Sequence, residues 1–112
     1  MAALQIKTVI IRAGEALSDG IDLSGMLTIQ MPDEWDSARL SFQLSPANVI
    51  YSDLCDFTGA EIQINVRAGT AVAIPERWSS ALSFMKFRSG ISAAPVIQKA
   101  ERTFRVAIAP GS

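Results

Sequence analysis

The sequence of 112 residues contains no histidine, and this absence removes several common kinds of functional site. Histidine is the usual general base, a frequent transition-metal ligand and the side chain that changes charge near neutral pH. The chain also lacks a Gly-x-Ser-x-Gly elbow, a Walker loop and a dinucleotide-binding fingerprint. The sequence therefore predicts no catalytic residue, no transition-metal site and no cofactor.

Cysteine and long apolar runs are equally scarce. The single cysteine, Cys55, permits neither an internal disulfide nor a Cys-x-x-Cys pair, and its neighbours Leu54 and Phe57 favour a buried side chain. Charged residues interrupt every apolar stretch before it reaches the ~20 residues that a membrane span needs. The first five residues lack the basic-then-apolar pattern of a signal peptide. We therefore expect a soluble protein, made and folded in a reducing cytoplasm, that does not contact a membrane.

The sequence also lacks a cationic excess, since 10 basic residues face 11 acidic ones for a net charge of -1. Phosphate recognition requires clear positive charge, so we expect no nucleic-acid partner. The charges are nevertheless unevenly placed. Residues 1–60 hold three basic and eight acidic residues (net -5), whereas residues 61–112 hold seven basic and three acidic (net +4). Either folding interleaves the two halves within one molecule, or opposite patches meet between neighbouring copies.

What the sequence does contain is apolar and polar residues in alternation, the period of a β-strand. Hydrophobic residues make up 49% of the chain, and Gly, Pro, Asn and Asp separate the alternating segments. The predicted strands cover residues 4–10, a short piece within 12–25, then 26–31, 39–44, 49–51, 61–67, 70–74, 82–88 and 101–108. About eight short strands separated by turns predict one all-β domain over residues 1–112, an antiparallel, jelly-roll-like β-sandwich.

Four finer expectations follow from the same pattern. In residues 4–10, Leu4 and Ile6 should share one face, which Thr8 would continue until the register blurs at Val9-Ile10-Ile11. Residues 61–67 show the cleanest alternation, with Ile62, Ile64 and Val66 inward. Residues 76–81 form the only plausible helical turn, and residues 89–95 read as a long loop of small residues.

Acidic residues occur close together in three places, and each could carry chemistry. Asp53 and Asp56 flank Cys55, and a carboxylate pair is what a glycosidase needs. The second group surrounds Trp35 and comprises Asp33, Glu34 and Asp36. Asp19 and Asp22, like Asp53 and Asp56, lie in predicted loops whose oxygens could bind calcium, although neither loop matches an EF-hand. Turn formation and capping account for most of these aspartates.

The aromatic residues allow a different interpretation. Trp35, Tyr51 and Trp78 could form a platform on which sugar rings stack, which would make the chain a carbohydrate-binding jelly roll. Packing in or beside the core competes with this interpretation, because both tryptophans stand beside prolines at strand ends.

Three segments together resemble small virion proteins encoded near the head genes of tailed phages and of gene transfer agents. The first is IRAGEALS at residues 11–18, leading through Ile21-Asp22-Leu23 to IQMP at residues 29–32. The second runs from Trp35-Asp36 to LSFQLS at residues 40–45, and the third is KFRSGISAAPVIQ at residues 86–98, ending with Arg102-Thr103. The resemblance implies a β-sandwich that decorates a phage head or builds a spike or fibre on it, and it supplies no catalytic residues.

The sequence therefore predicts a non-enzymatic component of a phage-like particle. Its partners would be capsid or other virion proteins and further copies of itself, and its location the virion. Contact residues are expected in the third segment, where apolar side chains follow a small-residue loop. The expected interface residues are Ile91, Val96, Ile97, Arg88 and Arg102, with Trp35 and Trp78 as glycan-stacking residues in the carbohydrate-binding alternative.

Overall fold

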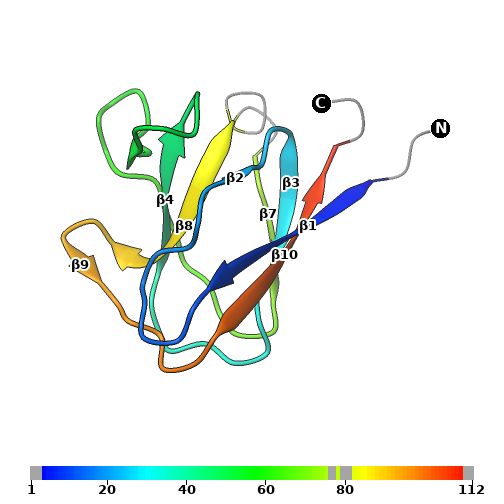
Figure 1. Ribbon diagram of the computed structural model, residues 1–112, viewed down its shortest axis with the longest axis vertical. Coiled ribbons are helices and arrows are strands. Elements are labelled where there is room, and N and C mark those ends of the chain that lie inside the picture. Colours follow the sequence, from blue (N-terminus) through cyan, green and yellow to red (C-terminus); the bar gives the residue numbers. More distant parts are fainter. Residues whose placement is uncertain (1–3, 76–77, 79–81, 110–112) are drawn as a thin grey trace.

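Two antiparallel sheets face each other in the computed structural model, which describes residues 4–75, 78 and 82–109 (Figure 1). The four-stranded sheet has the order β1-β10-β3-β7, and the six-stranded sheet has the order β2-β8-β4-β5, with β6 on β4 and β9 on β8. The first sheet consists of β1 (Gln5–Ile11), β10 (Arg102–Ile108), β3 (Met26–Gln30) and β7 (Ala71–Ala73). The second consists of β2 (Ile21–Asp22), β8 (Phe84–Ile91), β4 (Leu40–Ser45), β5 (Ser52–Asp53), β6 (Gln63–Ile64) and β9 (Ala94–Pro95). The predicted all-β sandwich is confirmed.

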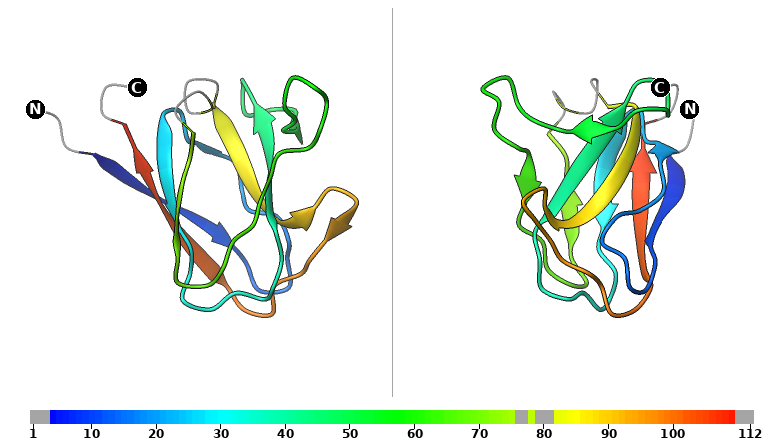
Figure 2. Two further views of the ribbon diagram at one scale, coloured as in Figure 1. Left: turned by 180° about the vertical axis from the view of Figure 1, so that it is seen from behind. Right: turned by 60° about the vertical axis from the view of Figure 1, so that its left-hand side comes forward.

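The strand order is that of a jelly roll. When β6 and β9, which lie off the main paths, are set aside, eight strands remain in chain order. Numbered one to eight, they give the orders 1-8-3-6 and 2-7-4-5 in the two sheets. Each sheet thus takes alternate strands from the two halves of the chain, as two Greek keys wound together require. Except for β4 and β5, consecutive strands of these eight lie in different layers, and the loops gather at the two ends of the sandwich (Figure 2).

Aromatic rings join the two layers at the centre of the core. Phe87 of β8 contacts Phe42 of β4 and Phe104 of β10, with ring centroids 5.3 and 5.2 Å apart and the rings nearly perpendicular. The ring of Trp35 packs edge-on against Phe104 at 5.5 Å. The apolar side chains of β10 predicted to face inward, Phe104, Val106 and Ile108, are all buried. Perpendicular packing of aromatic pairs adds to the stabilisation from area burial, so this row fixes the spacing of the two sheets.

The face that Leu4 and Ile6 share is the outer face of the first strand. Val9 and Ile11 of β1 are buried, whereas Leu4 and Ile6 are exposed. The run Val9-Ile10-Ile11 is apolar on both faces, so the pattern could not select one. The observed choice also turns Lys7 toward the second sheet, where its ammonium group donates to the backbone carbonyl of Asp22 at 2.6 Å.

Two predicted elements near the end of the chain change in extent. Residues 89–91 continue β8, and a tight turn leads into β9, so a β-hairpin replaces the predicted loop. The hydroxyl of Ser41 donates to the Gly90 carbonyl at 2.7 Å, and a side chain at Gly90 would lie 2.5 Å from the Ala94 carbonyl oxygen. Small residues at these positions serve close packing of a hairpin rather than a free loop.

Three other predictions differ from the structure or fall outside it. Only Gln63–Ile64 of residues 61–67 forms a strand, because β4 shares that edge between β5 and β6. Ile62, Ile64 and Val66 still pack against the core. Residues 49–51 form no strand, and β5 follows them instead. The predicted helical turn over residues 76–81 lies, apart from Trp78, outside the described residues.

The uneven charges of the sequence meet within one molecule. Five ion pairs join described residues, and three of them link residues 1–60 to residues 61–112. These three are Arg88 with Asp53, and Arg102 with Glu34 and Asp36. Interleaving of the halves therefore pairs part of the opposite charge within one molecule, as the first of the two interpretations predicts.

Candidate functional site

The loops on either side of β5 lie at one end of the sandwich (Figures 1 and 2). Three large apolar side chains on these loops are exposed. Val49 and Ile50 lie on the loop after β4, and Phe57 lies on the loop after β5. Tyr51 holds the first of these loops in place, because its ring lies under the ammonium group of Lys86 at 4.6 Å and its hydroxyl bonds to Asn48. The apolar tips therefore project from an anchored loop.

The carboxylate of Asp56 stabilises the turn in the loop that carries Phe57. Asp56 accepts hydrogen bonds from the Thr58 backbone N–H at 2.8 Å and hydroxyl at 2.5 Å, and from the Ala60 N–H at 3.2 Å. These bonds lower the pKa of Asp56, with those from Thr58 contributing most. Gly59 completes the turn with a φ of +88°. Asp-x-Thr-Gly is a sequence that favours such a turn, and it leaves the Phe57 ring at 101% relative exposure.

An apolar pocket of about 500 Å³ lies beside this loop. Its lining consists of Leu54, Cys55, Asp56, Phe57, Ile62, Trp78 and Leu82. The expectation of a buried Cys55 is wrong, because this thiol is exposed. Leu54 packs against the core, and neighbouring residues of an extended segment point to opposite sides, so Cys55 faces out. We call Phe57 and this pocket the phenylalanine surface.

The predicted interface residues fall into two groups. Ile97 is 63% exposed, and Ile91 and Val96 are half-buried at the hairpin. Arg88 and Arg102 are only 6% and 7% exposed and bind groups of their own chain. These two arginines therefore support the fold rather than offer their charge to a partner.

Arg88 clamps the base of the hairpin. Its guanidinium donates to the Ser41 hydroxyl at 3.0 Å, to Asp53 at 2.8 Å and to Glu61 at 2.5 Å. The two carboxylates in turn accept the Ser92 hydroxyl at 2.7 Å and its backbone N–H at 3.0 Å. Hydrogen bonds from Ser92 and Arg88 lower the pKa of Asp53. Asp53 is therefore held ionised, which suits a structural anchor and opposes a proton-donating role.

Gln98 and Arg102 form a second buried network under the Trp35 loop. The amide of Gln98 donates to the Asp36 carbonyl at 3.0 Å and to the Ser89 hydroxyl at 2.7 Å. Its oxygen accepts the Asp36 N–H at 2.9 Å and the Arg102 Nε at 3.0 Å. These contacts join segments 62 residues apart and fix the loop that carries Trp35.

The two tryptophans do not form one platform. Trp35 follows β3 and Trp78 follows β7, and these strands are antiparallel neighbours, so the two loops leave opposite ends of the sheet. The Trp35 indole N–H donates to the Ala38 carbonyl at 3.1 Å, and its ring packs on Phe104. Trp78 packs against the core and lines the pocket beside Phe57. Trp78 lines a pocket in which a sugar ring could stack on it. Trp35 and Trp78 lie too far apart to stack on one sugar together.

The remaining loop carboxylates make local contacts. Asp22 accepts the Ser24 hydroxyl at 2.6 Å and N–H at 3.0 Å, which lowers its pKa, and Asp19 pairs with Arg12 at 2.6 Å. Within residues 4–75, 78 and 82–109, no cluster of three or more potential metal ligands occurs. The loops considered for calcium thus use their aspartates for turns and ion pairs.

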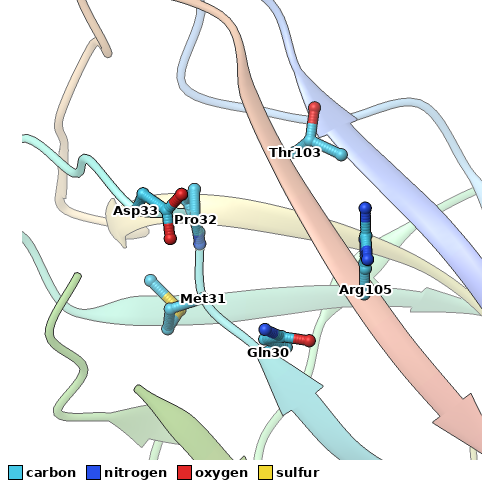
Figure 3. A pocket seen from close by; sticks show the side chains of 6 residues that line it. All are labelled: Gln30, Met31, Pro32, Asp33, Thr103 and Arg105. Atoms are coloured by element: carbon cyan, nitrogen blue, oxygen red, sulfur yellow. The ribbon is translucent and has the colours of Figure 1, made fainter. Parts of the chain in front are cut away.

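A shallow polar pocket of about 340 Å³ opens on the outer face of the four-stranded sheet (Figure 3). Thr103 and Arg105 reach it from β10, Gln30 from the end of β3, and Asp33 from the loop beyond. Arg105 belongs to none of the ion pairs that join described residues. The pocket offers one free guanidinium to an anionic group.

Phe57, Val49 and Ile50 were not predicted as surface contacts. The available signal was an apolar residue within the turn sequence Asp56 to Gly59, where burial is difficult.

No helix in the described part of the chain has the length and apolarity to cross a membrane. Comparisons with protein-family models, with curated proteins and with solved structures found no match to this chain.

Proposed function

We propose that this chain is a non-enzymatic structural protein of a phage or phage-like particle. It would decorate the capsid, or form part of a head spike or fibre, through contacts with capsid or other virion proteins and with its own copies. Its location would be the virion.

The phenylalanine surface carries this proposal. An aromatic ring that is exposed on every side contributes nothing to the core, and the Asp56 turn holds it in one position. Aromatic anchors of this kind supply much of the binding energy of protein interfaces, and a fixed loop lowers the entropy lost on binding. The adjoining apolar pocket enlarges the surface that a partner would cover.

The fold and the resemblance of three segments to virion proteins agree with this proposal without deciding it. Jelly rolls serve both in viral capsids and in lectins, so the architecture by itself does not assign a function.

A particle-incorporation assay tests the proposal. Particles purified from cells that produce the protein should contain it, and the Phe57→Ser variant should be lost from them while its thermal unfolding stays unchanged. Leu4→Ser, which removes an exposed apolar side chain outside the predicted contact regions, is the matched control and should remain in the particles. Absence of the unmodified protein from particles, or normal incorporation of Phe57→Ser, would refute the proposal.

The position of Trp78 favours one alternative, a carbohydrate-binding jelly-roll module that attaches to a host surface. Its ring lines the apolar pocket, where a sugar could stack. A glycan array distinguishes the two functions. Binding that is present in the unmodified protein and lost in Trp78→Ala, with the fold retained and Ile97→Ser unaffected, would replace the assembly proposal.

A further inference from the structure

The first strand forms an open edge of the four-stranded sheet. All seven residues of β1 pair with β10 in one continuous register, and β10 is its only strand partner among the described residues. In the right-hand view of Figure 2 the strand runs along the margin of the molecule. One side of its backbone therefore offers a row of N–H and C=O groups to an added strand.

The other sheet margins are protected and β1 is not. β7 has three residues, and β2 and β5 have two each, which is too short to template a partner. β1 contains no proline, glycine or bulge. Its one charged residue is Lys7, whose ammonium group donates a hydrogen bond to the Asp22 carbonyl. The lysine charge therefore does not block the addition of a strand at this edge.

We propose that a second copy of this chain adds its β1 antiparallel to β1, around a two-fold axis at Thr8, so that the two four-stranded sheets form one sheet of eight strands. The axis stands perpendicular to the sheet, because residues directly opposite each other must point to the same face. In the register centred on Thr8, residue 5 faces residue 11 and residue 6 faces residue 10 of the second copy. It is the one two-fold register that pairs all seven residues.

The side chains of β1 suit this register. Ile6, Thr8 and Ile10 point to the outer face, and Ile6 is 62% exposed. Their order reads the same in both directions, so each isoleucine meets an isoleucine and the threonines meet each other at the axis. Cross-strand pairs of β-branched residues stabilise a sheet. Lys7 lies opposite Val9, so no like charges face each other directly.

The surface beside the strand is hollowed. A groove of about 270 Å³ lies along residues 8–10 and is also lined by residues 19–21 and by Arg12 and Glu101. The exposed Arg105 is opposite Thr8 on β10, one strand inside the edge. The two Arg105 side chains of the dimer would stand three strand spacings apart, ~14 Å, which exceeds the screening length of ~8 Å at physiological salt.

Sedimentation equilibrium of the purified protein and two lysine variants tests the proposal. We expect a dimer for the unmodified chain and a folded monomer for Thr8→Lys, because two lysines would face each other at the axis. Thr28→Lys, on the same outer face but two strands inside the edge, should remain a dimer. A strict monomer at all concentrations, or a dimer that persists in Thr8→Lys, would refute the edge pairing. Loss of the dimer in Thr28→Lys would refute it too, since that result indicates stacking of sheet faces.

A disulfide tests the register. In a Cys55→Ser background, Thr8→Cys should crosslink to a covalent dimer on mild oxidation, because opposed residues have Cα atoms ~4.5–5.5 Å apart. Ile6→Cys should not crosslink, since its copy lies four residues away along the strand, ~14 Å. Crosslinking of Ile6→Cys, or none of Thr8→Cys, would contradict the register.

This dimer is independent of the phenylalanine surface. A monomer that still enters particles through Phe57 would refute the edge pairing alone, and a dimer absent from particles would refute the proposed function alone.

Discussion

The two sheets of this sandwich are stabilised in different ways. Apart from Arg102 at the start of β10, the inward side chains that the four-stranded sheet buries are apolar, among them Val9, Ile29 and Val106. The six-stranded sheet also buries Ser41, Ser45, Arg88 and Ser89 on β4 and β8, where loops cover the strands. The first sheet therefore depends on apolar burial, whereas the second also depends on buried polar groups, each of which must keep its partners.

The largest effect should come from the aromatic row that joins the two sheets. We expect Phe87→Ala to lower the free energy of unfolding by about 4 kcal/mol, because a fully buried ring is lost and a cavity remains between Phe42 and Phe104. Urea unfolding measures the change. Phe57→Ala is the same substitution at an exposed site and should change stability by less than about 0.5 kcal/mol. Equal effects of the two would contradict the assignment of Phe57 to the surface.

The next largest effect compares an arginine of each sheet. Arg88→Met should destabilise the protein by about 3 kcal/mol, because Asp53 and Glu61 would face each other without their cation and Ser41 would lose a donor. Arg105→Met makes the same change on the outer face of the four-stranded sheet and should cost less than about 0.5 kcal/mol. Similar losses for both variants would show that the buried polar cluster does not distinguish the sheets.

A smaller effect should follow from the second polar network. Gln98→Leu preserves the volume of the side chain but leaves the Asp36 N–H and the Arg102 Nε without their acceptor, which should cost about 2 kcal/mol. Gln30→Leu, on the exposed face of β3, is the matched control and should be close to neutral. A neutral Gln98→Leu would mean that water replaces the lost amide.

The contrast between the sheets also explains what the sequence could predict. In β10 the apolar residues Phe104, Val106 and Ile108 alternate with the outward Thr103, Arg105 and Ala107, and this alternation placed the three apolar residues correctly. In β4, the buried serines Ser41 and Ser45 alternate with buried apolar residues, so both faces of the strand are covered. The sequence pattern predicts burial only for the apolar face. The run Val9-Ile10-Ile11 is apolar on both faces, so the sequence could not show that the face of Leu4 and Ile6 is the outer one.

The buried arginines and the exposed phenylalanine could not be located from the sequence for a related reason. Arg88 meets Asp53 and Glu61 across 35 and 27 residues, and Gln98 meets Asp36 across 62. Spacing along the chain carries no information about such contacts, so Arg88 and Arg102 were interpreted as surface charges. Conversely, Phe57 was considered only as an apolar neighbour that favours burial of Cys55, and the sequence did not show that the Asp56 turn directs the Phe57 ring to solvent.

The smallest effect should be on the pH dependence of the free energy of unfolding, and it comes from Asp53 in the six-stranded sheet. The pKa of Asp53 is lowered in the folded protein by Ser92 and Arg88, while the unfolded chain has the ordinary value of about 3.9. As the pH falls, the unfolded chain binds a proton first, so the stabilisation is complete above the unfolded pKa and is lost through the lower folded one. The free energy of unfolding should therefore fall between pH 5 and pH 3 by a smaller amount in Asp53→Asn than in the unmodified protein. The carboxylate is partly exposed, so solvent screening keeps the difference small. The free energy of unfolding is measured by urea titration at each pH. If it changes equally with pH in the two proteins, the partners of Asp53 do not lower its pKa, and the clamp depends on Glu61 alone.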